Sequence, residues 1–173
     1  MNNIKLKFDN DGFIVNENLI NQVDLEAIEK WISELNDSKE VNHHYEKTVN
    51  GKVLSRTENF VSSHTSFREF LLSSSIKDYL TMLFDDEPIL FKEKINYKYP
   101  GGAGYAPHQD APAYPFGKKH ITMLLAIDDS DISNGCLEFA RGRNNEGIIN
   151  IDEKGCIDSV SYTHLTLPTT GIV

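Results

Sequence analysis

The pattern of apolar residues changes at Pro88, and this change constrains the fold of the 173-residue chain more than any other feature. Before Pro88 the apolar residues recur every three or four positions, which is the spacing of an amphipathic helix. After Pro88 they alternate with polar residues, which is the spacing of a half-buried strand. Helices followed by short strands predict an α+β chain whose sheet carries the functional site.

The clearest helix is expected over residues 21–35, where Asn21 and Asp24 are both candidate N-caps. Two shorter helices are predicted at 67–72 and 76–84. Other segments before Pro88 are expected to be a strand at 11–15, a polar loop at 39–51 and extended backbone at 52–61. After Pro88 the alternation predicts strands at 89–99, 105–110, 119–127, 136–140 and 148–151.

The triplet His108-Gln109-Asp110 is the strongest candidate for chemistry. On a strand, residues i and i+2 point to the same face, so one imidazole and one carboxylate are presented together. They are two of the three ligands of the facial triad of non-haem Fe(II) oxygenases, which leaves three positions open for a keto-acid and O2. A surface histidine beside an acidic turn residue has the same sequence, so the triplet alone leaves both interpretations open.

Several segments around this triplet stand in an order typical of one family. They are residues 91–98, the Pro-Gly-Gly loop at 100–102, residues 106–114 and residues 134–138. Together with the start at 11–15 and the helix after it, they resemble the phytanoyl-CoA dioxygenase family of Fe(II)/2-oxoglutarate oxygenases over nearly all of residues 1–159. The family tends to continue with Pro-Gly-Ser-His after Leu-Glu-Phe, whereas this chain has Arg141-Gly142-Arg143-Asn144 after Ala140.

The resemblance implies a double-stranded β-helix, or jelly roll, with Fe(II) and 2-oxoglutarate inside it. It makes His108 and Asp110 the first two iron ligands; the family's distal His and cosubstrate-binding Arg have no assigned counterpart before residue 159. Such an enzyme couples decarboxylation of 2-oxoglutarate, to succinate and CO2, with hydroxylation of a small organic substrate by O2. Phosphonates, amino-acid derivatives and acyl thioesters are candidate substrates.

The cosubstrate is a dianion, so hydrogen-bond donors that face the metal are expected to help hold it. Lys94 and Asn96 share one face of a predicted strand, Tyr105 stands just before the triplet, and Thr122 is the polar residue on its strand face. The alternatives are a solvated face for Lys94 and ordinary packing for Tyr105. A last group of polar residues is expected to be structural rather than functional: Gln109, His43, His44, Arg56, Glu58, His120 and Cys136.

Net charge, apolar runs and cysteines limit the expected partners and location of the protein. The net charge is −9, whereas a duplex-binding protein usually carries a basic face, so nucleic acid is not an expected partner. The longest strongly apolar run, at 121–127, is far shorter than the roughly 20 residues of a membrane span. The start of the chain lacks the apolar core of a signal peptide, and the two cysteines form no CxxC motif. We therefore expect a reduced, cytoplasmic protein.

Residues 160–173 read VSYTHLTLPTTGIV and contain no Asp, Glu, Lys or Arg. One interpretation is a Thr-rich strand; the preferred one is a translated sequencing adapter, which residues 160–170 resemble. On that interpretation residues 1–159 are one portion of a dioxygenase domain, residues 160–173 are a non-native tail, and the chain itself is inactive. His164 is then not a candidate ligand.

Two other function classes stay open. The first is a non-catalytic jelly-roll binding module, which a degraded His-x-Asp motif would favour, although both residues are present. The second is a zinc hydrolase that uses His108 and Asp110. It would need a further neutral ligand and a base for water, and the sequence shows no such motif.

Overall fold

The computed structural model of the chain describes residues 3–49, 51–100, 104–110, 112 and 119–149, and the backbone of 165–166. Its Cα positions divide the chain into two compact units. The sheet unit is Leu19–Ala103; the motif unit, which contains the His-x-Asp triplet, is Met1–Asn18 together with Gly104–Val173.

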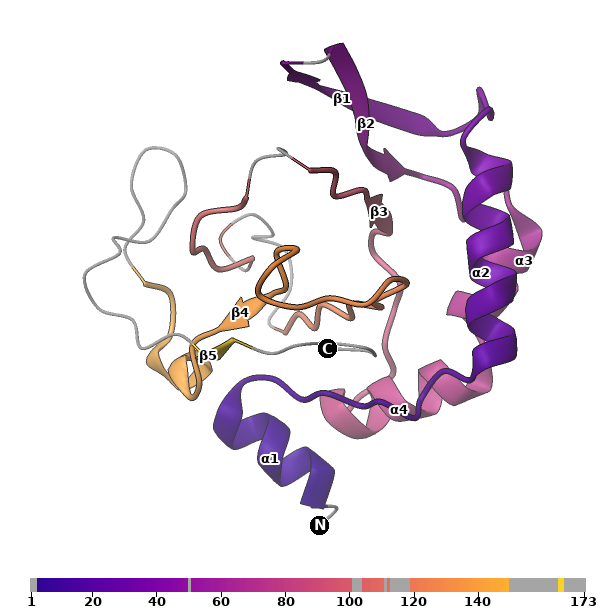
Figure 1. Cartoon of the computed structure of the whole chain (residues 1–173). Coiled ribbons are helices and arrows are strands. Elements are labelled where there is room, and N and C mark those ends of the chain that lie inside the picture. Colours follow the sequence, from indigo (N-terminus) through magenta and orange to yellow (C-terminus); the bar gives the residue numbers. More distant parts are fainter. Residues whose placement is uncertain are drawn as a thin grey trace. The chain divides into compact units, whose positions relative to one another are not determined.

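The sheet unit combines helices with a three-stranded antiparallel sheet in the order β1-β2-β3 (Figure 1). Its elements are α2 (Gln22–Leu35), β1 (Asn42–Thr48), β2 (Gly51–Glu58), α3 (Thr65–Leu71), α4 (Ser74–Phe84) and β3 (Lys94–Asn96). The three helices expected before Pro88 are confirmed, each starting within two residues of its predicted position.

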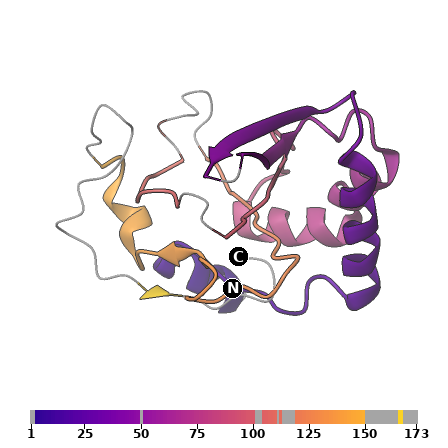
Figure 2. The ribbon, with the colours of Figure 1, turned by 45° about the horizontal axis from the view of Figure 1, so that its top comes forward.

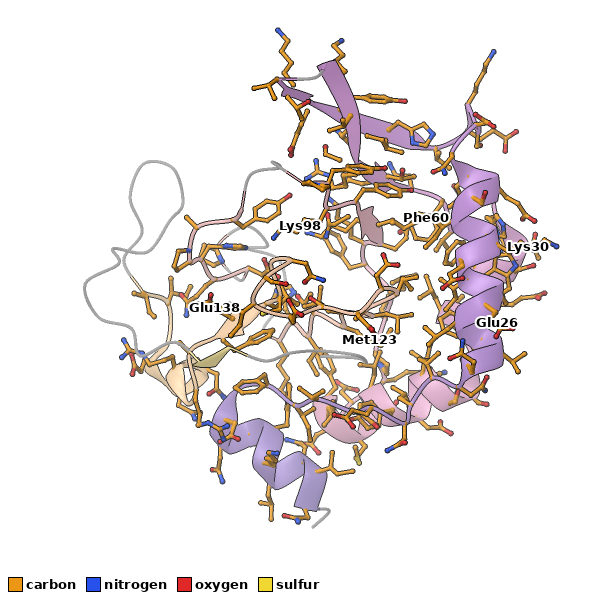
Figure 3. The ribbon with its side chains drawn as sticks, viewed as in Figure 1. Glu26, Lys30, Phe60, Lys98, Met123 and Glu138 are labelled. Atoms are coloured by element: carbon orange, nitrogen blue, oxygen red, sulfur yellow. The ribbon has the colours of Figure 1, made fainter. Side chains whose placement is uncertain are left out.

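The helix α2 forms because its start is capped and its apolar stripe is buried. The Asn21 side chain accepts a hydrogen bond from the Asp24 backbone N–H at 2.9 Å. Ile28 is 2% exposed, and the Trp31 ring meets the Phe67 ring of α3 edge-on at 5.2 Å between centroids. The opposite, exposed face carries residues such as Glu26 and Lys30, both labelled in Figure 3. The aromatic contact joins α2 to α3.

The loop predicted at 39–51 is wrong, because residues 42–48 form β1 and pair with β2 in a long hairpin (Figure 1). Most β1 side chains are exposed; only His43 and Thr48 are half-buried. A strand with both faces near solvent shows no apolar alternation, so the sequence lacked the signal that identifies strands. The extended backbone predicted at 52–61 is confirmed by β2 over most of its length.

The strand predicted at 89–99 is much shorter in the structure, where β3 covers 94–96 and pairs with β2. The predicted alternation is confirmed from residue 93 to residue 98, whereas Phe91, expected on the same face as Ile95, is 60% exposed. Lys94 and Asn96 are exposed, whereas Ile95 and Tyr97 are half-buried. The Tyr97 hydroxyl lies 3.2 Å from the hydroxyl of Thr57, which is fully buried, so the inner face of β3 carries a buried polar contact.

The motif unit begins with a helix that the sequence did not predict. Its elements are α1 (Asn3–Asp11), β4 (Glu138–Phe139), the 3₁₀ helix η2 (Arg143–Glu146) and β5 (Leu165–Thr166), which pairs with β4. The strand predicted at 11–15 is wrong because Gly12, at φ +82°, ends α1 and donates its N–H to the Phe8 carbonyl at 2.8 Å. Phe13 is then buried and stacks on Phe139 at 5.1 Å.

The four residues that depart from the family pattern lie against α1 (Figure 2). Arg141 forms an ion pair with Asp11, and the Gly142 N–H donates to the Asp11 carbonyl at 2.8 Å. The Asn144 side-chain amide donates to the Asp9 carbonyl at 3.0 Å. Carbonyls at the end of a helix lack intrahelical partners, so this loop completes the hydrogen bonding of α1.

The strands predicted at 105–110, at 119–127 and at 148–149 do not form, and of 136–140 only 138–139 is a strand; residues 150–151 lie outside the described part. A strand requires a run of residues that pair with a neighbour. Among the described residues of these segments, Leu125 forms an isolated bridge, which is too short to make a strand. Across all the described ranges of the chain, every helix is too short or too polar to cross a membrane.

Candidate metal centre

His108 lies in a segment without regular secondary structure, and one ring nitrogen already has a partner. Its Nδ1 is 2.8 Å from the Ala106 carbonyl oxygen. A carbonyl only accepts hydrogen bonds, so Nδ1 carries the proton that it donates. In the neutral imidazole this leaves the Nε2 lone pair free, which is the arrangement of a metal-binding histidine.

Asp110 turns its carboxylate toward that free nitrogen. Asp110 Oδ1 lies 3.6 Å from His108 Nε2, and both side chains are 44% exposed. This distance is too long for a hydrogen bond. The other carboxylate oxygen, Oδ2, accepts a hydrogen bond from the Thr122 hydroxyl at 2.8 Å. Thr122 therefore contacts one predicted ligand directly.

The pair fits a metal ion in its donor types and its geometry. With its proton on Nδ1, the imidazole offers the Nε2 lone pair, and the carboxylate offers the lone pairs of Oδ1; both are donor atoms that a divalent cation accepts. Adjacent ligands about 2.1 Å from a metal lie about 3 Å apart, which is about 0.6 Å closer than this pair. In the described part of the chain no third His, Cys, Asp or Glu completes a cluster with them.

Gln109 holds the backbone between His108 and Asp110 in place, although no strand forms there. Its side-chain amide donates to the Gly147 carbonyl at 3.0 Å, and its side-chain oxygen accepts from the Ile149 N–H at 2.8 Å. These two bonds, called the Gln109 clamp below, attach the backbone between the ligands to residues 147–149. The predicted structural hydrogen bond of Gln109 is confirmed, although the strand on which the prediction relied is absent.

The four predicted cosubstrate residues divide between the two units. The Tyr105 side chain is 70% exposed, and its ring centroid is 6.2 Å from that of His108. The Thr122 hydroxyl donates a hydrogen bond to Asp110. Lys94 and Asn96 are exposed on β3 and belong to the sheet unit. Sequence reasoning missed the Ala106 carbonyl, because a main-chain group has no residue-type signal.

A cluster of charged side chains lies at the end of β2, around Arg56 and Glu58, which the sequence analysis expects to be structural. Glu58 Oε1 is 3.0 Å from Arg56 Nε and 3.0 Å from Lys92 Nζ, and Oε2 is 3.3 Å from His44 Nε2. Burial alone raises the pKa of Glu58. The Lys92 hydrogen bond and the charges of Arg56, Lys92 and His44 outweigh burial, so the pKa lies below its usual range.

The adjacent histidines His43 and His44 have separate partners. His43 Nδ1 is 2.9 Å from the Thr57 hydroxyl and its Nε2 is 3.1 Å from the Ser38 carbonyl, whereas His44 meets Glu58. Both have the structural contacts expected from the sequence.

Comparison with known proteins adds an independent line of evidence. The family described as Phytanoyl-CoA dioxygenase (PhyH) matches residues 8–163. A methylphosphonate hydroxylase from Gimesia maris is 38% identical over 156 residues, which are 88% of this chain and 60% of that protein. A 2-aminoethylphosphonate dioxygenase from the uncultured bacterium HF130_AEPn_1 is 36% identical over 161 residues, which are 88% of this chain and 62% of that protein.

Among solved structures, AviO1 from Streptomyces viridochromogenes Tue57 matches with a TM-score of 0.68 and 18% identity. The match covers 98% of this chain and 80% of AviO1, which shows a likeness of fold. The chain spans about three fifths of the length of the two phosphonate-named relatives.

Proposed function

The chain belongs to the phytanoyl-CoA dioxygenase family, and we propose that it contributes the first two metal ligands of an Fe(II)- and 2-oxoglutarate-dependent dioxygenase. The observation that carries the proposal is the free Nε2 of His108, which faces Asp110 Oδ1 at 3.6 Å while Nδ1 is bound to the Ala106 carbonyl. The double-stranded β-helix, the 1–159 boundary and the cytoplasmic location belong to the same proposal.

Each residue of the pair has a defined task. His108 supplies a neutral nitrogen whose tautomer is set by Ala106, and Asp110 supplies negative charge that offsets the charge of a divalent cation. When bound, Fe(II) with O2 and 2-oxoglutarate supplies the oxidation, releasing succinate and CO2. The chain's own residues orient the ligands: the Ala106 carbonyl binds His108 Nδ1, and the Thr122 hydroxyl donates to Asp110 Oδ2.

Lys94, Asn96 and Tyr105 are the proposed contacts to 2-oxoglutarate. Lys94 and Asn96 point from the exposed face of β3, where a cation and an amide can donate to carboxylate oxygens. Tyr105 places its ring beside His108. Support for Tyr105 comes from that proximity, and support for Lys94 and Asn96 comes from their shared exposed face and the family resemblance.

We further propose a small organophosphonate as the substrate. Two relatives at 38% and 36% identity are named for methylphosphonate and 2-aminoethylphosphonate. Both names describe a small molecule with an anionic phosphonate group, which is consistent with one of the substrate classes expected from the sequence.

The test measures turnover in a full-length protein that carries residues 1–159. With Fe(II), O2, 2-oxoglutarate and either methylphosphonate or 2-aminoethylphosphonate, we expect succinate release coupled to hydroxylation. His108→Ala and Asp110→Ala should abolish it. Asp110→Glu should also fail, because the extra methylene displaces the carboxylate by about 1 Å. The matched control is His120→Ala, which removes an exposed histidine and should leave turnover unchanged.

Near-native decarboxylation of 2-oxoglutarate by His108→Ala or Asp110→Ala would contradict the ligand assignment. Binding of a phosphonate without any succinate release would instead indicate the non-catalytic binding module. Hydrolysis that depends on zinc and not on 2-oxoglutarate would indicate the zinc hydrolase.

A further inference from the structure

Thr122 has one hydroxyl proton, and the structure shows where it goes. Its Oγ1 lies 2.8 Å from Asp110 Oδ2, twelve residues away in the chain. An ionised carboxylate only accepts hydrogen bonds, so Thr122 must be the donor. While that bond is made, Thr122 has no second proton to donate to the carboxylates of 2-oxoglutarate. The contact with Asp110 therefore favours a role other than the cosubstrate contact expected from the sequence.

The bond matters because the carboxylate of Asp110 would otherwise rotate. The final torsion of an aspartate is broad, and this side chain is 44% exposed, so packing alone does not hold it. With Oδ2 held by Thr122, Oδ1 is the oxygen that faces His108 Nε2. Thr122 is itself well suited to this task, since its β-branched side chain has few accessible rotamers.

We propose that Thr122 is a positioning residue that holds the Asp110 carboxylate in its metal-binding orientation. The inference rests on the proposed function, because it requires His108 and Asp110 to be metal ligands. Groups that orient metal ligands from outside the coordination sphere typically change metal affinity by about 10–100-fold when removed.

The experiment titrates the full-length protein that carries residues 1–159 with Co(II), a redox-stable substitute for Fe(II), and follows binding by calorimetry and by the visible absorption of the metal. Thr122→Val keeps the shape of the side chain but removes the hydroxyl, and we expect Co(II) binding about 10–100-fold weaker. Thr122→Ser keeps the hydroxyl and should bind Co(II) nearly as tightly as the wild type. Thr81→Val on α4 is the control for loss of a threonine hydroxyl elsewhere.

Thermal unfolding of the metal-free proteins separates positioning from a structural role. We expect Thr122→Val and Thr122→Ser to unfold at nearly the same temperature as the wild type. If Thr122→Val and Thr122→Ser lose Co(II) affinity equally, the hydroxyl is not responsible and the inference is overturned. It is also overturned if Thr122→Val binds Co(II) normally but raises the KM for 2-oxoglutarate in the full-length protein, because Thr122 would then contact the cosubstrate.

The two proposals fail in different ways. If the wild type binds Co(II) and His108→Ala does not, while Thr122→Val matches the wild type, only the role of Thr122 is wrong. If the wild type binds no Co(II), or if His108→Ala binds it equally well, the metal site itself is wrong and the role of Thr122 is rejected with it.

Discussion

Glu58 illustrates at the residue scale how one carboxylate can depend on several neighbours. Its side chain is 10% exposed, and its oxygens lie within 3.3 Å of nitrogens of Arg56, Lys92 and His44. Burial of a charged group costs free energy unless the charge is paired, and here the pairing outweighs the burial. The result is a pKa below the usual range, despite the desolvation that opposes it.

This lowered pKa predicts a pH-dependent stability. A carboxyl with a lower pKa in the folded protein stabilises it above the unfolded pKa, about 4.3 for Glu. That contribution is lost as the pH falls through the folded pKa. At pH 7 we expect Glu58→Gln to lower the free energy of unfolding by about 1–3 kcal/mol, since Arg56, Lys92 and His44 lose the charge with which they pair. In urea unfolding measured from pH 7 to pH 3, the difference in unfolding free energy between Glu58→Gln and the wild type should decrease as the pH falls.

The control for this prediction is Glu26→Gln on the exposed face of α2, which should change the unfolding free energy little at any pH in this range. A Glu58→Gln effect that stayed constant from pH 7 to pH 3 would show that ionisation of Glu58 does not contribute to stability.

At the scale of elements, the ligand segment is held by side chains rather than by a β-ladder. Residues 104–110 contain no strand, and the Gln109 clamp replaces the main-chain bonds that a neighbouring strand would make. One side-chain amide here donates and accepts, as a strand residue does with its backbone. The clamp and the Thr122 hydroxyl are thus two side-chain restraints on the same short segment.

We predict that Gln109→Leu increases the hydrogen-exchange rate of the Ile149 amide about 5–10-fold, the effect of losing about 1 kcal/mol. The Ile149 N–H donates to the Gln109 side-chain oxygen, so its protection depends on that acceptor. Gln109→Glu keeps an acceptor at this position but loses the donor to Gly147, and it should preserve the protection of Ile149. An unchanged exchange rate at Ile149 in Gln109→Leu would show that the clamp does not persist in solution.

At the scale of the whole molecule, the buried apolar residues are distributed unevenly. Among the described residues, those in the core are Phe13, Ile28, Leu35, Val41, Phe60, Phe67, Ile76 and Leu83. Phe13 alone of this set belongs to the motif unit, and the rest belong to the sheet unit. Because buried apolar area is the main favourable term in folding, the sheet unit is expected to hold more of the stability.

Hydrogen exchange with mass-spectrometric detection can test this distribution. In the wild type we expect α2, α3 and α4 to exchange more slowly than residues 138–149. Ile76→Ala creates a cavity at a side chain that is 1% exposed, and it should destabilise the sheet unit by about 2–5 kcal/mol. Exchange should then accelerate in α2, α3 and α4 and change little in 138–149. Equal acceleration in both units would show that they unfold as one.

The sequence by itself determined the features that depend on neighbours along the chain. The helices α2, α3 and α4 were predictable because helical hydrogen bonds link residues four apart, so the apolar spacing and the Asn21 cap are local signals. The alternation at β3 was also predictable, because successive side chains of a strand point to opposite faces and the pattern is therefore local. The His-x-Asp triplet was identifiable as a candidate because both residue types lie two positions apart.

Only the tertiary structure decided the features that need a partner from elsewhere in the chain. The carbonyls at the end of α1 accept hydrogen bonds from residues 142–145, and β1 is a strand because β2 pairs with it. The orientation of Asp110 likewise follows from Thr122, twelve residues away in the chain. A hydrogen-bond partner brought close by folding leaves no spacing pattern in the sequence, so these contacts could not be read from it.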